Sequence, residues 1–522
     1  MPIRMYRTST PSRFLFGLCF IGTFGALALL HGPLLHLPYY WDEAGYYIPA
    51  ALDFFHHGLL IPQTTLPTGH TPLVSVCLAL AWWLLGYAPL VTRLTMIAFA
   101  AATLVALYAL GRTVARRETA LWACILLALS PLFFAQSSLA FLDLPAAFTT
   151  TVAVWALLRR RMAWFAVAAS VAVLTKETAV VIVPVAMVFG WRFRKDLRKN
   201  DGLWLAAPVV TLGAWGIYYH HVTGFWTGNA EYLQYNLYST LEPGRIVLSL
   251  LRRLHQVFIA GFNGLLVVAA LLGYRRMKKG PANAIGNGER ASEQSPARKE
   301  FFFLSAGLAV AYVAMLSLVG GAVLPRYLLP MFPCFYLALI MLVDCLPRRV
   351  MRAALVLVAA CFVASWSINP PYPFAYEDNL AYADFIQLHQ QAAEILSSRP
   401  DGPRVLTAWP ATDELAHPEL GYVKRPIRVA GVTGFTAQDF RNVSPGSFDL
   451  LYLYSRKWDP PSNWLRRLPL IARTDEYAPP IVPGVLVKRF HLRLLAAFSR
   501  RGQWVKIYAR QENQHPGAPV NF

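Results

Sequence analysis

The sequence predicts a polytopic α-helical membrane protein followed by a small α/β domain. Of the 522 residues, 56% are hydrophobic and only 15% are charged, whereas a soluble domain carries about 25% charged residues. Apolar runs close to the ~20 residues needed to cross a bilayer recur up to residue 369. Beyond that point the apolar runs shorten to strand length and turn residues become frequent.

Eleven apolar runs are predicted to span the membrane, at 14–37, 92–114, 119–137, 144–158, 162–175, 177–191, 202–219, 246–273, 301–320, 327–346 and 351–369. A further run, 71–90, is also apolar enough to span, and the basic residues decide its place. If 71–90 lies in the interface, the loops with 24 of the 30 Lys and Arg residues before residue 370 share one side. The positive-inside rule then predicts a cytoplasmic N-terminus and an outer C-terminus.

The predicted domains are a transmembrane domain over 1–369 and an extracytoplasmic α/β domain over 370–522. The first outer loop, 38–91, is expected to hold membrane-lying helices, and the polar segment 274–300 a flexible cytoplasmic linker. In the α/β domain we expect a helix at 376–398 and strands at 404–408, 448–455, 484–490 and 503–510. Its charges form no motif, which favours a lid or packing module.

The net charge of +20 does not indicate nucleic-acid binding. The basic residues of the first 369 positions lie mostly in short loops between apolar runs, where they act as topology signals. All six cysteines lie in apolar runs without metal-site spacing, so neither a disulfide framework nor a thiolate metal site is expected.

Acidic and basic residues gather on the predicted outer face. Asp42 and Glu43 stand side by side after the first span, and Asp143 stands at the entrance of a later one. Six basic residues lie at outer helix ends, where the positive-inside rule makes them rare: Arg93, Lys176, Arg245, Arg252, Arg253 and Arg326. Ionisable residues at a bilayer boundary are costly unless they serve a purpose, and binding an anionic group is one.

This set of residues suits glycosyl transfer from a lipid-linked sugar phosphate. The phosphate leaving group needs no proton, but Arg or Lys must stabilise its charge. The acceptor hydroxyl needs a carboxylate as general base, and the glycosyl carbon develops oxocarbenium character. Structural explanations stand beside this one: Asp143 as a helix cap, Lys176 with Glu177 as a local ion pair, and Arg326 with Tyr327 as an interfacial anchor.

An ordered set of motifs adds to this interpretation: WDEAGYY (41–47), GHTPL (69–73), SPLFFAQSSLAFLDLPAAF (130–148), LTKE (174–177) and PRYLLP (325–330). From residue 14 to about 350 the chain resembles the GT-C glycosyltransferases of the protein O-mannosyltransferase and aminoarabinose transferase type, including the glycosyltransferase 39/83-like proteins. Each motif alone is weak, and the ordered set indicates the family rather than the substrate. One departure is Thr71, where the family usually has proline.

For the acidic residues, the resemblance implies that Asp42 is the essential carboxylate, with Glu43 beside it and Asp143 at the second acidic position. Some relatives use a divalent cation, for which Asp42 and Asp143 are the candidate ligands. The implied reaction is an inverting transfer from a polyprenyl-phosphate sugar. The acceptor is a glycolipid of the lipopolysaccharide type or a protein.

For the basic residues, the resemblance places Lys176 and Arg326, with Tyr327, near the donor phosphate. His70 replaces a family His or Lys, and Arg93 is a further candidate for the same phosphate. The implied location is the cell (inner) membrane.

Two other functions stay open. A transporter or flippase of a lipid-linked sugar is disfavoured, because charges gather at helix ends rather than at the midplane and no internal repeat is evident. A catalytically inactive scaffold with the same fold is disfavoured by the retained acidic and basic residues.

Overall fold

The computed structural model describes residues 13–193, 201–279, 296–368, 374–399, 402–456 and 479–511. The chain forms two compact units. The helical unit comprises Met1–His36, Tyr46–Ile368 and Glu377–Leu380. The C-terminal unit comprises Leu37–Gly45, Asn369–Tyr376 and Ala381–Phe522, so the first eight residues of the predicted first outer loop, 38–45, fold with the end of the chain.

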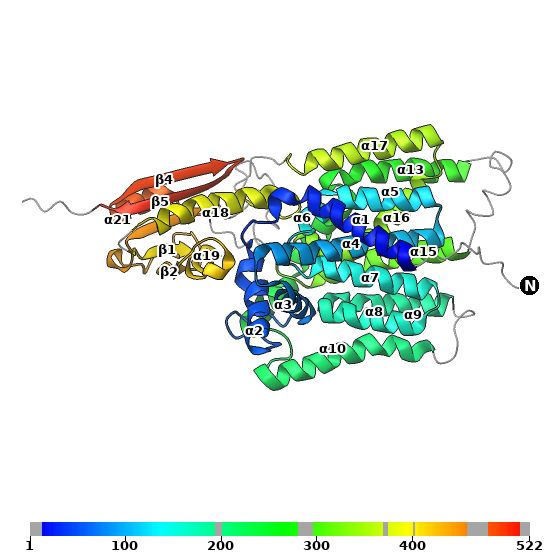
Figure 1. The fold of residues 1–522 in the computed structure, drawn as a ribbon, viewed down its shortest axis with the longest axis horizontal. Helices are drawn as coiled ribbons and strands as arrows, with labels where there is room; N and C mark the ends of the chain where they lie inside the picture. Colours follow the sequence, from blue (N-terminus) through cyan, green and yellow to red (C-terminus); the bar gives the residue numbers. More distant parts are fainter. Residues whose placement is uncertain are drawn as a thin grey trace, which may run out of the picture. The chain divides into compact units, whose positions relative to one another are not determined.

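The helical unit is built almost entirely of α-helices (Figure 1). They are α1 (Arg13–Leu30), α2 (Ile48–His57), α3 (Leu73–Leu85), α4 (Pro89–Val114), α5 (Arg117–Leu129), α6 (Pro131–Gln136), α7 (Asp143–Leu158), α8 (Met162–Thr175), α9 (Ile182–Arg192), α10 (Asp201–Thr223), α11 (Ala230–Asn236), α12 (Pro243–Phe258), α13 (Asn263–Lys279), α15 (Pro296–Leu318), α16 (Phe332–Val343) and α17 (Arg348–Ser365). Two 3-10 turns, η3 (Glu177–Val181) and η7 (Pro325–Met331), lead into α9 and α16.

Each predicted span coincides with a helix or with consecutive helices, as expected for an integral membrane protein. The run 119–137 is divided into α5 and α6 at Pro131, which cannot donate a backbone hydrogen bond. Within the described ranges, α4, α10, α15 and Pro325–Val343 are each long and apolar enough to cross a bilayer, and α12 with the segment up to Lys279 forms a pair bent by 41°. The number of eleven spans stays a prediction.

The run 71–90 contains α3, whose 13 residues are fewer than the ~20 that a span needs. The helix ends at Gly86, whose φ of 84° suits glycine. Trp82 of α3 donates its indole N–H to Thr92 Oγ1 at the start of α4, at 2.9 Å. The non-spanning placement of 71–90 stays a prediction.

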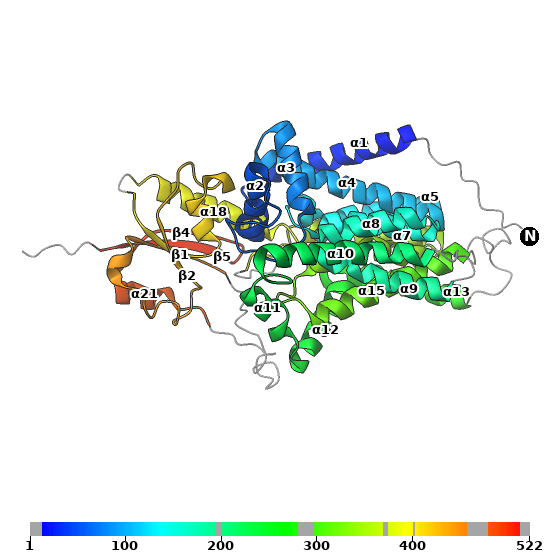
Figure 2. The same ribbon diagram turned by 90° about the horizontal axis from the view of Figure 1, so that it is seen from below.

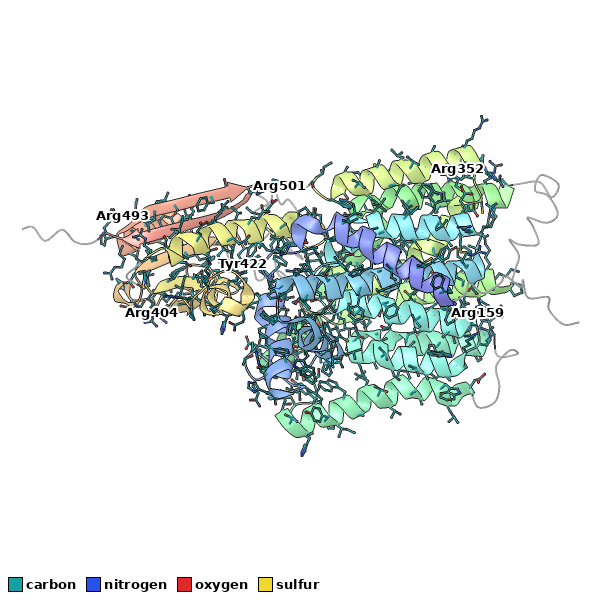
Figure 3. All side chains as sticks on the ribbon, in the orientation of Figure 1. Arg159, Arg352, Arg404, Tyr422, Arg493 and Arg501 are labelled. Carbon is teal, nitrogen blue, oxygen red and sulfur yellow. The ribbon has the colours of Figure 1, made fainter. Side chains whose placement is uncertain are left out.

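The two ends of the helical unit differ (Figures 1 and 2). At one end, here called the loop end, lie α2 and α3. At the other, here called the basic end, lie Arg159 after α7 and Arg352 in α17 (Figure 3). The basic loops 159–161 and 348–352 therefore share one end of the bundle, as predicted.

Small residues let two pairs of helices approach closely. A Cβ on Gly111 of α4 would lie 2.7 Å from Cβ of Ala120 in α5. A Cβ on Gly273 of α13 would lie 2.0 Å from the carbonyl oxygen of Leu342 in α16. Membrane helices pack through small residues in this way, because lipid offers no hydrophobic drive for their association.

The C-terminal unit has a five-stranded mixed sheet in the order β2-β1-β3-β5-β4. Its strands are β1 (Val405–Ala408), β2 (Val429–Val432), β3 (Leu450–Tyr454), β4 (Leu492–Arg500) and β5 (Gln503–Arg510), and its helices α18 (Ala381–Ser397), α19 (Ala411–Ala416) and α21 (Pro483–Phe490). Strand β1 pairs in parallel with β2 and β3, whereas β5 pairs antiparallel with β3 and β4.

Several elements of this unit were predicted, and one prediction was wrong. The expected helix and three of the expected strands correspond to α18, β1, β3 and β5, whereas β2 and β4 were not expected. The predicted strand at 484–490 is helix α21 instead. Pro483 suits the first helical position, and the buried Leu486 and Phe490 are four residues apart, which is helical spacing.

The expected linker is shorter than its polar sequence indicates. Residues 274–279 continue α13 and residues 296–300 begin α15. The part 280–295 lies outside the described residues, as do Arg4, Arg7 and the basic run 194–199.

Candidate functional site

Three interruptions between helices place the candidate charged residues at the loop end. Asp143 is the first residue of α7, which runs from the loop end to Arg159 at the basic end. Lys176 has an extended backbone (φ −155°, ψ 125°) that separates α8 from η3. Arg326 lies in η7, where Pro325 fits the start of the turn.

These three residues form a buried ionic cluster. Lys176 Nζ lies 2.5 Å from Asp143 Oδ1, and Arg326 Nε lies 3.4 Å from Asp143 Oδ2. Their side chains are 5%, 1% and 1% exposed, respectively, for Lys176, Asp143 and Arg326. The positive end of the α7 dipole adds to the stabilisation of the carboxylate. The structure thus joins three residues that are far apart in the sequence.

A second carboxylate, Glu377, completes the cluster. Its Oε2 accepts a hydrogen bond from Arg326 Nη1 at 2.7 Å. Residues 377–380 are held in the helical unit by two further bonds: Gln136 Nε2 donates to the Glu377 carbonyl at 2.8 Å, and Leu380 N–H donates to the Trp366 carbonyl at 3.0 Å. Glu377 follows the last apolar run in a short polar stretch, so no periodicity or motif pointed to it.

Two aromatic rings line the cations of this cluster. The centroid of the Tyr327 ring lies 4.1 Å from Lys176 Nζ and 5.3 Å from Arg326 Cζ. The Phe141 ring lies 3.9 Å from Arg326 Cζ. Cation–π contacts of this kind become stronger where water is excluded. Tyr327 was predicted beside the phosphate, and here it contacts both candidate cations.

Arg253 of α12 is a third cation on the same aromatic ring, with its Cζ 5.6 Å from the Tyr327 centroid. Helix α12 lies beside α15 (Figure 2). The fully buried Arg253 donates to the Leu324 carbonyl at 2.6 Å and to Gln256 Oε1 at 3.1 Å. Among the residues that the structure describes, Arg253 forms no ion pair within 4 Å, although its charge interacts with Asp143 at longer range, and its Nε has no hydrogen-bond acceptor.

With Arg253 included, the cluster contains different numbers of cations and carboxylates. Lys176, Arg326 and Arg253 supply three cations, whereas Asp143 and Glu377 supply two carboxylates. A buried charge without a counter-charge is strongly unfavourable. Within the ion-paired and ring-contacting group the cations therefore outnumber the carboxylates by one, and the neighbouring Glu177 also interacts electrostatically with Lys176.

His70 pairs with Glu177 next to this cluster. His70 Nδ1 lies 3.1 Å from each carboxylate oxygen of Glu177, so Glu177 pairs with His70, and Lys176 pairs with Asp143. Tyr232 lies beyond the imidazole, with ring centroids 6.0 Å apart. Burial, and then the negative charge of Glu177, raises the pKa of Tyr232 well above its usual value, so this hydroxyl remains protonated.

Two contacts shape the surroundings of the cluster. Asp53 Oδ2 accepts the backbone N–H groups of Gln63 and Thr64, at 2.7 and 2.9 Å, and so fixes the loop that leads to His70. Arg93 of α4 is buried and donates to the Ser138 carbonyl at 2.8 Å, in the connection between α6 and α7. Arg93 thereby holds the segment that precedes Asp143.

Asp42 and Glu43 belong to the C-terminal unit, and the structure separates their environments. Glu43 is fully buried, and its Oε2 accepts the backbone N–H of Tyr40 at 2.8 Å, which closes a tight turn. Asp42 lies at this turn and is only half-buried. Glu43 therefore has a local structural task that its place beside Asp42 did not reveal.

Of the two candidate metal ligands, Asp143 does not fit a metal centre. The Asp143 oxygens face Lys176 and Arg326, which are cations themselves. Within the described ranges there is no group of three or more His, Cys, Asp or Glu side chains able to hold a metal ion.

No protein-family model matches the chain, and no curated protein matches it. The solved structures give clear similarities. ArnT from Cupriavidus metallidurans in the apo state has a TM-score of 0.53 at 12% identity, over 94% of this chain and 98% of that chain. The same protein bound to undecaprenyl phosphate has a TM-score of 0.55 at 12% identity, over 95% and 98%. The apo oligosaccharyltransferase of Archaeoglobus fulgidus has a TM-score of 0.46 at 13% identity, over 85% and 70%.

The similarity to ArnT covers both units of the chain and shows a shared fold. ArnT is an aminoarabinose transferase with the GT-C fold, so the predicted resemblance is confirmed at the level of the fold.

Proposed function

We propose that this chain is an inverting glycosyltransferase that takes a sugar from a polyprenyl phosphate. The observation that carries the proposal is the cationic surplus of the buried cluster, with Arg253 unpaired by any described carboxylate. Such a surplus is best explained by an anionic ligand that completes the site. The phosphate of a sugar phosphodiester is negatively charged and would supply the hydrogen-bond acceptor that Arg253 Nε lacks among the described residues.

The surroundings of the cluster favour a lipid-linked phosphate over a soluble one. The cluster lies at the end of a bundle whose helices are apolar enough to cross a bilayer, so a donor anchored in the membrane would present its phosphate at that depth. The structure of ArnT bound to undecaprenyl phosphate, which has the same fold, supports this donor class.

In the proposed reaction, Asp42 takes the proton of the acceptor hydroxyl. The oxygen then attacks the anomeric carbon from the face opposite the phosphate, and the bond between this carbon and the phosphate oxygen breaks. Lys176, Arg326 and Arg253 stabilise the charge that develops on the leaving polyprenyl phosphate. A single displacement of this kind inverts the anomeric configuration.

We assign positioning tasks to the remaining candidates. Asp143 holds Lys176 and Arg326 together, because both cations contact its carboxylate. His70 borders the phosphate pocket together with Glu177, and Arg93 supports the connection before Asp143. Glu43 supports the turn at Asp42.

The location is proposed from the basic residues of the sequence, and the acceptor class from the resemblance to the GT-C glycosyltransferases. The positive-inside rule favours a cytoplasmic N-terminus and a reaction on the outer face of the inner membrane. A glycolipid of the lipopolysaccharide type or a protein side chain is the proposed acceptor, since both are present on that face.

The test is sugar release by the purified protein in lipid nanodiscs, from a panel of polyprenyl-phosphate sugars. We expect the wild type to release sugar from one donor class. Asp42→Asn should release it at least ~100-fold more slowly, because general-base catalysis contributes about that much to a reaction rate. Equal rates in both proteins would remove Asp42 from the mechanism. Translocation of an intact donor without release would identify a flippase instead.

A further inference from the structure

Residues 37–45, which carry Asp42, are built into the C-terminal unit, although some 330 positions separate them from the other residues of that unit. Tyr39, Tyr40, Glu43 and Ala44 are almost completely buried. The loop that the proposed function needs is therefore part of the core of the domain that shows no chemical motif of its own.

Hydrogen bonds tie this loop to the C-terminal unit at two points. The Leu420 carbonyl accepts the Tyr39 N–H at 3.2 Å, and the Tyr422 hydroxyl donates to the Tyr39 carbonyl at 3.0 Å. The Tyr40 hydroxyl donates to the Ala375 carbonyl at 2.7 Å. Figure 3 shows Tyr422 within the C-terminal unit, near α18 and α19. Both polar groups of the Tyr39 backbone are thus bound to residues 420–422.

Aromatic packing holds the other side of the loop. The Tyr40 and Trp41 rings lie 5.6 and 5.4 Å from the Phe385 ring of α18. The Trp41 ring also lies 5.6 Å from the Trp409 ring, after β1. A Cβ on Gly45 would come within 2.5 Å of Trp409 Nε1. Trp409 therefore packs against the loop on both sides of Asp42.

The loop conformation also shows strain. Trp41 has a φ of 45°, a left-handed conformation that is unfavourable in a residue other than glycine. Strain of this kind persists only where the surroundings fix the backbone. Here the fixed points are the Glu43 bond to Tyr40 and the contacts of Tyr39, Tyr40 and Trp41.

We propose that the C-terminal unit is part of the catalytic machinery, because it positions Asp42 through Tyr422 and Trp409. This inference rests on the proposed function, in which Asp42 is the general base. In this inference the contacts that set the position of the base lie within the C-terminal unit. Tyr422 and Trp409 are positioning residues that act through the loop.

The inference predicts that variants of Tyr422 and Gly45 lower kcat but leave lipid-phosphate binding unchanged. Tyr422→Phe removes only the hydroxyl that binds the Tyr39 carbonyl, and we expect kcat to fall by about 5- to 10-fold, in line with one hydrogen bond of about 1 kcal/mol. Gly45→Ala displaces the Trp409 indole, and we expect a fall of about 100-fold, as for a shift of about 1 Å in a catalytic group.

The matched control is Tyr452→Phe. Tyr452 is a buried tyrosine of β3 in the same unit, and its hydroxyl has no hydrogen-bond partner in the described part of the chain. We expect its kcat and its binding of undecaprenyl phosphate to equal those of the wild type. Thermal unfolding of all four proteins, in nanodiscs, shows whether each variant is folded.

The measurements are kcat for sugar release and the Kd of undecaprenyl phosphate. A lower kcat at unchanged Kd, for both Tyr422→Phe and Gly45→Ala, supports the inference. Unchanged kcat in folded variants, or a Kd that weakens as much as kcat falls, overturns it while the proposed function stands. Absence of both release and binding in the wild type overturns the proposed function, and this inference with it.

Discussion

The two ends of the helical unit use the same residue types in different ways. At the basic end, ion pairs join one arginine to one carboxylate: Arg160 to Glu300 at 2.9 Å and Arg352 to Glu118 at 3.1 Å. These two arginine side chains are 22% and 61% exposed. At the loop end, three buried cations share one aromatic ring and face two carboxylates.

This difference separates structural ion pairs from a ligand site. A partly exposed, balanced pair contributes only about 0–1 kcal/mol and requires no further partner. A buried cluster with more cations than carboxylates is unfavourable by itself, and for this reason the proposed function places an anionic phosphate there. Burial and charge balance, rather than the presence of Arg and Lys, distinguish the proposed phosphate site from the basic end.

The largest effect is expected for Lys176→Met, which leaves one oxygen of the buried Asp143 without its closest cation. Removing one partner of a buried pair destabilises by about 3–5 kcal/mol, so both sugar release and the unfolding temperature should fall steeply. The double variant Asp143→Asn with Lys176→Met should recover much of the unfolding temperature but none of the activity. Full activity in the double variant would show that the cluster is structural.

Arg253→Gln should separate binding from stability. No described carboxylate loses a partner, so the free energy of unfolding should change by no more than about 1 kcal/mol. The affinity for undecaprenyl phosphate should fall by about 10- to 100-fold, since a charged hydrogen bond contributes about 1.5–3 kcal/mol. Isothermal titration in nanodiscs, with thermal unfolding alongside, measures both. Unchanged affinity would contradict the phosphate assignment of Arg253.

Glu377→Gln should have the next largest effect, and it should strengthen rather than weaken the binding of an anionic ligand. The amide keeps the shape of the side chain beside Arg326 but raises the positive surplus of the cluster by one charge. The product, a phosphate monoester with a second pKa near ~6, gains its second negative charge above that pH. We expect product inhibition at pH 7.5 to become about 3- to 10-fold stronger in the variant, and less so at pH 5.5, because one pKa unit corresponds to about 1.4 kcal/mol. Weaker inhibition would mean that Glu377 orients Arg326 instead.

The sequence located the membrane helices and three members of the cluster well. Hydropathy is a property of whole segments, so the apolar runs agree with the helices even where Pro131 divides one of them. Asp143, Lys176 and Arg326 were recognisable because a charge that interrupts an apolar run is rare. The positive-inside rule also marked Arg253 as unusual at an outer helix end. The sequence did not show which residues it would contact.

Other features depend on contacts that no local pattern records. Glu377 lies in a polar stretch where an acidic residue is ordinary, and only its bond to Arg326 distinguishes it. Asp42 and Glu43 are neighbours in the sequence, yet one is half-buried and the other closes a turn in a core. Similarly, the β-branched residues of 484–490 favoured a strand, but Pro483 and the packing of Leu486 and Phe490 gave a helix.

The smallest effect is expected at the basic end, where Arg352→Gln removes an exposed partner of Glu118. The free energy of unfolding should change by less than about 1 kcal/mol, because exposed pairs are screened by water and salt. Sugar release and undecaprenyl phosphate binding should stay within about twofold of the wild type, since a change of 1.4 kcal/mol corresponds to a factor of ten. A large loss of binding in this variant would break the contrast between the two ends, because an ordinary ion pair would then matter as much as the buried cluster.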